Sequence, residues 1–220
     1  MQPYRDNDSS PELVDDPGLL ASLQGWSEEV YVDFLALQNE TMTEDEFRQK
    51  YEVTRAILDL DITGFTESCM HEGQIASLLR IFDTQKVVVP ILQRHGAQLM
   101  RAFADDLVAL FRNVDNAVDA ALEIHEQIDA FNHAHPRERP PQCCIGIGYG
   151  AVFAIGPNLA QGDEMNRASK LGEDTARGGE TLLTENAIQA IGHRHDIEAE
   201  LQQVDDLLFP YYRVTRVEND

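Results

Sequence analysis

The feature that most constrains the fold of this chain is the alternation of short apolar runs with amphipathic helical stretches. An apolar run over 56–62 predicts a strand, and the pattern over 74–93 predicts a helix. A β-hairpin is predicted over 98–111, with its turn near 104–106, and an amphipathic helix over 116–131. Strands that alternate with helices and hairpins indicate an α/β or α+β domain with a mixed sheet.

The second half of the chain continues this alternation. The expected elements are a glycine-punctuated strand or hairpin over 143–155, a helix over 162–176, a strand over 181–184, a short helix over 185–191, and two strands near 196–201 and 211–217. The sequence shows no internal repeat, and 220 residues are enough for one domain with a sizeable core.

The first 53 residues differ from the rest. Residues 1–18 are rich in Asp, Ser, Pro and Asn, and we expect them to be disordered. Residues 19–53 are predicted to form an N-terminal helical extension, in which Thr43 and Glu46 make a capping box for a short helix. The main domain is therefore expected over 54–217.

Two further expectations concern individual helices. In the helix over 74–93, Pro90 is expected to produce a kink or an interruption. His125 is expected on a solvated helix face. The residues expected on the buried side of the helix over 74–93 are Ile75, Leu78, Leu79, Phe82 and Ile91.

Charge and composition exclude several classes of partner. The chain has 39 acidic and 17 basic residues, a formal net charge of −22, which repels nucleic acids and anionic membranes. No apolar stretch approaches the ~20 residues of a membrane span, and the N-terminus lacks the features of a signal peptide. The adjacent Cys143 and Cys144 form neither a disulfide framework nor a zinc pattern, so they are expected to be small strand residues. We expect a cytoplasmic protein.

Two carboxylates lie at positions that suit the binding of divalent cations. Asp61 and Asp105 each occupy a strand end or turn beside an apolar run. Two such carboxylates can hold a pair of divalent cations, although Asp is also common in ordinary turns.

Five motifs around these residues, in this order, resemble the signatures of class III adenylate and guanylate cyclases. They are Asp61-Ile62-Thr63-Gly64-Phe65-Thr66 (similar to DIxGFT), Arg101-Ala102-Phe103-Ala104-Asp105 (KxxGD), Gly146-Ile147-Gly148-Tyr149-Gly150 (GIHxG), Gly162 to Leu171 (GxxVNxASRL) and Gly179 to Thr184 (GEIxVS). Any one of these motifs alone is weak, but the ordered set is specific.

The resemblance implies an α+β fold with a ferredoxin-like βαββαβ core, a mixed and mostly antiparallel sheet, and a head-to-tail homodimer with two shared sites. The family's reaction converts a nucleoside triphosphate into a 3′,5′-cyclic nucleotide and pyrophosphate. It implies two Mg²⁺ or Mn²⁺ ions per site. ATP is the expected substrate, and the expected role is second-messenger signalling.

The resemblance also assigns residues. Asp61, Asp105 and the carbonyl of Ile62 match the metal ligands, and Gly64, Phe65 and Thr66 match the segment that cradles the triphosphate. The matches to the ribose and transition-state residues are Asn166 and Lys170, and the matches to the base-selecting residues are Arg101 and Leu159. In the shared site, Asp61 and Asp105 would come from one subunit and Arg101, Asn166 and Lys170 from the other.

Departures from the family pattern leave alternatives open. Lys170 replaces an Arg, Arg101 replaces the adenylate cyclase Lys, and Leu159 replaces its Asp. The lysine expected to bind the triphosphate has no match around 204–207. The alternatives are a UTP or GTP cyclase, for instance in antiphage signalling, and a nucleotide-binding homologue with little turnover.

Overall fold

The computed structural model of the chain describes residues 13–22, 25–63, 65–155, 160–192, 194–202 and 209–217, with the side chains of 65–68 and 99 left out. The helices in these ranges are α1 (Pro17–Ser22), α2 (Glu28–Gln38), α3 (Glu44–Tyr51), α4 (Phe65–Glu72), α5 (Gln74–Arg94), α6 (Val114–Ala134), α7 (Asp163–Asp174) and α8 (Glu185–Ala190). The strands there are β1 (Glu52–Ile62), β2 (Leu99–Phe103), β3 (Asp106–Phe111), β4 (Cys143–Ala154), β5 (Ala160–Gln161), β6 (Thr181–Thr184), β7 (Ile197–Gln202) and β8 (Tyr211–Arg216).

One sheet organises these elements, with the order β2-β3-β1-β4-β6-β8-β7 and β5 paired to the outer part of β4. Only the β4–β6 pair is parallel among the pairs described. The first four strands, read with their helices, give β1, α4–α5, β2, β3, α6 and β4. This is the predicted βαββαβ core, so the predicted α+β fold with a mixed, mostly antiparallel sheet is confirmed.

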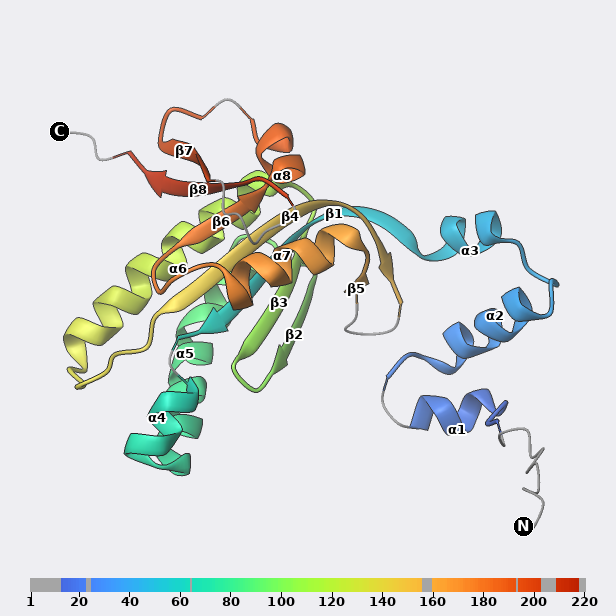
Figure 1. Cartoon of the computed structure of the whole chain (residues 1–220), viewed down its shortest axis with the longest axis horizontal. Helices are drawn as coiled ribbons and strands as arrows, with labels where there is room; N and C mark the ends of the chain where they lie inside the picture. The colour runs from blue at the N-terminus through green and yellow to red at the C-terminus, as the bar shows by residue number, and fades with distance from the viewer. Residues whose placement is uncertain are drawn as a thin grey trace, which may run out of the picture.

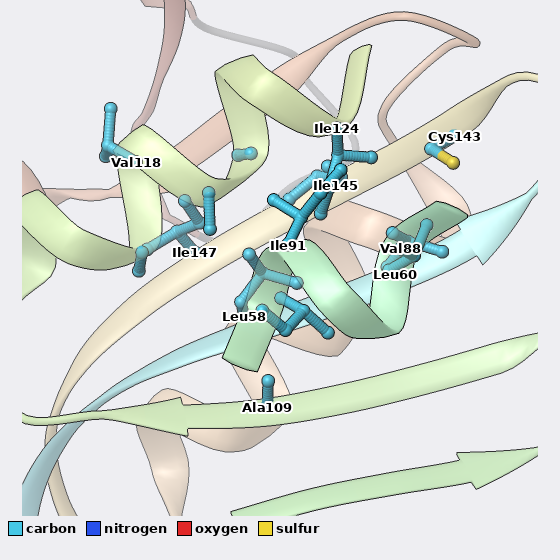
Figure 2. Close-up of a cluster of buried hydrophobic side chains, with 14 of the residues drawn as sticks. Leu58, Leu60, Val88, Ile91, Ala109, Val118, Ile124, Cys143, Ile145 and Ile147 are labelled. Carbon is cyan, nitrogen blue, oxygen red and sulfur yellow. The ribbon is translucent and has the colours of Figure 1, made fainter. Parts of the chain in front are cut away.

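The main core lies between the sheet and the helices α5 and α6. Because side chains alternate along a strand, Leu58 and Leu60 of β1 face these helices. Figure 2 shows them beside Val88 and Ile91 of α5, with Ile145 of β4 close by. The apolar faces of these two long helices bury this side of the sheet.

Helix α7 covers the opposite face, and in Figure 1 it crosses the sheet in front of β1 and β4. Its close approach depends on glycine. A Cβ on Gly146 would lie 2.0 Å from the carbonyl oxygen of Ala168, and a Cβ on Gly172 would lie 2.8 Å from that of Asp59. The glycines of the 146–150 motif therefore serve helix–sheet packing.

In its described residues the N-terminal extension forms three helices, α1 to α3, where the sequence predicted a helical region with a separate short helix after Thr43. Thr43 and Glu46 form the predicted capping box at the start of α3. Phe47 of α3 packs against Phe153 of β4, with ring centroids 5.7 Å apart, and Ile155 joins the same cluster. The extension thus rests on the far end of β4 (Figure 1). The division of the chain at residue 53 stays a prediction.

The structure corrects the prediction for the buried face of α5. Ile91 is buried, but Ile75, Leu78, Leu79 and Phe82 are 54–75% exposed. At this end of α5 the buried side is formed instead by Ser77, Arg80, Ile81 and Thr84, so the predicted stripe lies on a face that the described segments leave exposed. Pro90 lies within α5, which continues to Arg94 without interruption.

Other side chains in the core also bear on the predictions. His125 is half-buried rather than solvated, and its Nε2 lies 2.9 Å from the hydroxyl of Thr181. Cys143 and Cys144 are buried free thiols in β4, as predicted. Within the described parts of the chain, no helix is both long and apolar enough to span a membrane.

Candidate active site

Asp61 and Asp105 lie at the same end of the sheet. Asp61 is the penultimate residue of β1, and Asp105 occupies the turn between β2 and β3. Ala104 opens that turn with a φ of 54°, the left-handed conformation that glycine adopts most easily. Burial raises the pKa of Asp61 to about 6, and the negative charge of Asp105 adds to the rise. The two carboxyl groups therefore interact across this edge.

More acidic groups surround the pair. Asp106 begins β3, and Glu173 lies in the last turn of α7; both also raise the pKa of Asp61. Asp59, two residues earlier on the same face of β1, is 1% exposed, and burial raises its pKa to about 7. Ser169 of α7 donates a hydrogen bond to its Oδ2 at 2.6 Å, and Oδ1 has no partner.

Arg101 supplies the compensating charge. It lies on β2 opposite Val108 of β3, and its charge lowers the pKa values of Asp59, Asp106 and Glu173. Sequence reasoning placed Arg101 in the site of the other subunit. Within a single chain, its guanidinium acts on the acidic groups beside that chain's own Asp61.

The donor set fits a hard divalent cation. Among the residues that the structure describes, no three His, Cys, Asp or Glu side chains converge into a preformed metal cage. Mg²⁺ typically takes only one or two carboxylates and completes its shell with water and substrate phosphates. Two partly buried carboxylates that repel each other, beside the peptide of Ile62, match that pattern. These residues therefore suit a metal that arrives with a nucleotide.

The segment that follows β1 is held in place at Thr63. Its N–H donates to the carbonyl of Gln142 at 2.9 Å, and its own carbonyl accepts a hydrogen bond from Arg80 at 2.9 Å. Arg80 is 4% exposed and also donates to the carbonyls of Arg139 and Pro140. Of the predicted triphosphate cradle, Gly64 lies outside the described residues. Phe65 and Thr66 begin α4, with side chains outside the description.

Asn166 and Lys170 lie one turn apart on the exposed face of α7. The ammonium of Lys170 is 2.6 Å from the carboxylate of Asp174. The charges that act most strongly on Asp61 come from acidic neighbours instead. The structure therefore brings Asp61 and Asp105 together and leaves Lys170 in an ion pair on its own helix. Leu159 and the segment 203–208 lie outside the described residues.

Two buried polar residues near these positions were not predicted from the sequence. Arg80 holds Thr63, and Glu164 of α7 is buried against the sheet. For Glu164 a signal was available, because helical periodicity places it with the inward-facing Ala168 rather than with Asn166. For Arg80, the partners are distant in sequence and no local pattern reveals them.

Comparison with known proteins agrees with this geometry. No family model matches the chain. It is 28% identical over 148 residues to the receptor-type guanylate cyclase gcy-8 of Caenorhabditis elegans, covering 60% of this chain and 12% of that protein. It is 30% identical over 156 residues to adenylate cyclase 1 of Rhizobium meliloti (strain 1021), covering 64% of this chain and 23% of that protein.

Solved structures show the same fold. The guanylate cyclase domain of RhGC from Catenaria anguillulae, in complex with GTP, superimposes with a TM-score of 0.64 at 20% identity, covering 76% of this chain and 99% of that one. The chain spans less than a quarter of the length of the curated relatives it matches. The predicted resemblance to a nucleotide cyclase catalytic domain is confirmed.

Proposed function

We propose that this chain is a nucleotide cyclase that converts a nucleoside triphosphate into a 3′,5′-cyclic nucleotide and pyrophosphate. The observation that carries the proposal is the coupled pair of carboxylates, Asp61 at the end of β1 and Asp105 in the β2–β3 turn. This pair stands within a fold shared with cyclase catalytic domains.

The proposed reaction forms one bond to phosphorus and breaks one. The ribose 3′-hydroxyl gives its proton to solvent and its oxygen attacks the α-phosphorus. The bond from that phosphorus to the bridging oxygen of the β-phosphate breaks, and pyrophosphate leaves with that electron pair. Asp61, Asp105 and the carbonyl of Ile62 would hold two Mg²⁺ or Mn²⁺ ions. When bound, these ions lower the pKa of the 3′-hydroxyl and neutralise phosphate charge.

The remaining residues orient the substrate and stabilise charge. Asn166 would hold the ribose, and Lys170 would place a positive charge near the phosphorus as negative charge develops there. To do so, the ammonium of Lys170 must leave the carboxylate of Asp174 and pair with the substrate. That exchange is inexpensive because both side chains are at least half exposed, and exposed ion pairs contribute only ~0–1 kcal/mol.

We further propose that the active form is a homodimer, with Asp61 and Asp105 of one subunit facing Asn166 and Lys170 of the other. The exposed apolar surface supports this arrangement. Phe103 is 71% exposed at the end of the edge strand β2, two residues before Asp105. The apolar stripe on α5 adds to the surface that is left open in the single chain.

We take ATP as the substrate, with UTP and GTP as the alternatives. Adenine offers one donor and one acceptor, but Leu159 accepts nothing and Arg101 only donates. Arginine suits acceptor-rich bases, namely guanine at O6 and N7 or uracil at its carbonyls. A nucleotide-binding homologue without turnover is the second candidate function, favoured by Lys170 in place of Arg.

The test is incubation of the chain with each of the four ribonucleoside triphosphates and Mn²⁺ or Mg²⁺, with products identified by mass spectrometry. A cyclic nucleotide from at least one triphosphate supports the proposal. Unchanged triphosphate in every reaction, together with nucleotide binding measured by calorimetry, would favour the binding-only function.

A further inference from the structure

Helix α7 has two distinct faces. Its buried residues, Glu164, Ala168, Leu171 and Gly172, turn toward the sheet, and Asn166 and Lys170 are exposed on the other side. Three of the four buried residues are small or apolar. The fourth, Glu164, is a carboxylate that is 5% exposed, and nothing in the proposed chemistry uses it.

The carboxylate of Glu164 is fully engaged by surrounding donors. Its Oε2 accepts hydrogen bonds from the N–H of Tyr149 at 3.1 Å and the hydroxyl of Thr184 at 2.7 Å. Its Oε1 accepts from Asn186 at 2.8 Å and from Arg167 at 3.1 Å. These donors belong to β4, β6, α8 and α7 itself, so one side chain joins four elements.

Space for this side chain is made by glycine. A Cβ on Gly150 would lie 2.7 Å from the Cγ of Glu164, and a Cβ on Gly148 would lie 2.7 Å from its carbonyl oxygen. Thr184 is completely buried, and its hydroxyl also accepts the N–H of Ala187 as the cap of α8. Thr184 therefore holds the inner side of this carboxylate in a fixed position.

An anchor of this kind sets the rotation of the helix about its axis. Residues two apart on an α-helix point about 200° away from each other. Fixing Glu164 against the sheet therefore directs Asn166 away from it, and Lys170, one turn later, in nearly the same direction. Ser169, hydrogen-bonded to Asp59, fixes the other half of α7 in the same rotation.

The geometry points to Glu164 as a positioning residue that aims Asn166 and Lys170 at the metal-binding carboxylates of a second copy of the chain. This inference rests on the proposed shared site. Glu164 contacts no substrate, and it acts by holding the helix that does. A misplacement of about 1 Å can cost about 10²-fold in rate, so loosening the anchor should lower kcat with little effect on KM.

The conservative test is Glu164→Gln, which keeps the shape and one acceptor. It loses the charge that binds Arg167 and one of the two accepting oxygens. Glu164→Ala is a poorer test, because four donors would lose their acceptor and the protein could fail to fold. Glu185→Gln, an exposed acid in the first turn of α8, is the matched control.

The experiment uses mixed dimers. A chain with Asp61→Ala is combined with a chain carrying Asn166→Ala, which leaves one working site built from Asn166 of the first chain and Asp61 of the second. Glu164→Gln is then added to one chain or the other. In the Asp61→Ala chain, whose α7 serves the working site, it should lower kcat by about 10- to 100-fold. In the Asn166→Ala chain, whose α7 serves no working site, it should add no loss.

Equal losses in both placements would show general damage and overturn the inference, as would no loss in either. Absence of activity in the first pair, before Glu164 is changed and despite demonstrated subunit exchange, would instead contradict the shared site. In that case the Glu164→Gln homodimer still decides the role of Glu164. Loss of kcat with unchanged KM and unchanged thermal stabilisation by Mn²⁺ supports positioning, whereas parallel loss of Mn²⁺ stabilisation contradicts it.

Discussion

Asp61 and Asp105 lie close enough for the charge of Asp105 to reinforce the effect of burial, and together they raise the pKa of Asp61 to about 6. Two acids arranged in this way destabilise each other unless a cation lies between them. Folding retains the arrangement at a cost in stability, and a bound metal ion offsets that cost.

Asp61→Asn should abolish turnover and stabilise the metal-free protein. Because the folded-state pKa of Asp61 is above its unfolded value, its ionised form disfavours folding above about pH 6. Solvent screening limits the gain to about 1 kcal/mol, or roughly 2–4 °C in Tm for a chain of this size. Thermal unfolding at pH 8 with EDTA measures it.

The same variant should lose the rise in Tm that Mn²⁺ produces in the unsubstituted protein. Glu126→Gln, which removes an exposed acid on α6, is the control and should leave both turnover and the Mn²⁺ effect intact. Full turnover in the Asp61→Asn protein, or in Asp105→Asn, would contradict the assignment of the metal ligands.

Lys170→Ala should lower kcat by about 10²–10³ while changing KM little, because a preorganised cation is lost mainly from the transition state. Lys170→Arg should retain or increase kcat, since a planar guanidinium matches phosphate oxygens better than an ammonium does. Steady-state kinetics on both variants checks this. If neither kcat nor KM moves in the Ala variant, Lys170 is a surface residue paired with Asp174.

Stability should fall in acid partly through His125. Burial lowers the pKa of this histidine to about 4, below the unfolded value of about 6.5. Between these values the unfolded chain binds a proton that the folded chain does not, so stability decreases as pH falls from about 6.5 to 4. The effect reaches about 3 kcal/mol.

The test for His125 is the free energy of unfolding of the unsubstituted protein and of His125→Gln, measured by urea titration from pH 7 to pH 4. As the pH falls, the free energy of unfolding of His125→Gln should rise relative to that of the unsubstituted protein. A difference independent of pH would show that His125 does not titrate in this way.

The unsubstituted protein should prefer ATP only weakly over UTP, and substitution should restore that preference. An unpaired buried polar group costs ~1–3 kcal/mol, so the mismatch at Leu159 and Arg101 should reduce the preference for ATP by roughly 5- to 150-fold relative to a pocket with both partners. The double variant Leu159→Asp with Arg101→Lys should recover that preference. Competition between equal ATP and UTP measures it, and a strong ATP preference in the unsubstituted protein would contradict our interpretation of both residues.

Much of the fold was predictable from local patterns. The hairpin around Asp105, the helix after Asn113 and the strand that ends at Ile62 all carry the periodicity of their element, and periodicity depends only on near neighbours. The short β5 carries no such signal, because two residues are too few to show a period.

What the sequence could not supply is the set of tertiary partners. The residues Ile75, Leu78, Leu79 and Phe82 share one face of α5, but the prediction that this face is buried was wrong, because periodicity does not say whether a segment of the same chain covers it. Likewise Glu164 resembles any first-turn acid of a helix until β4, β6 and α8 assemble around it. The motif matches located the candidate site, and the arrangement that holds it came only from the structure.

The most direct test of the account is the stoichiometry of a single reaction. The unsubstituted protein is incubated with ATP and Mn²⁺, and cyclic nucleotide and pyrophosphate are measured together by mass spectrometry and ³¹P NMR. Equal amounts of the two products are expected from the unsubstituted protein, and neither product from the Asp61→Asn protein. Release of inorganic phosphate and nucleoside diphosphate without a cyclic product would contradict the proposed cyclase reaction.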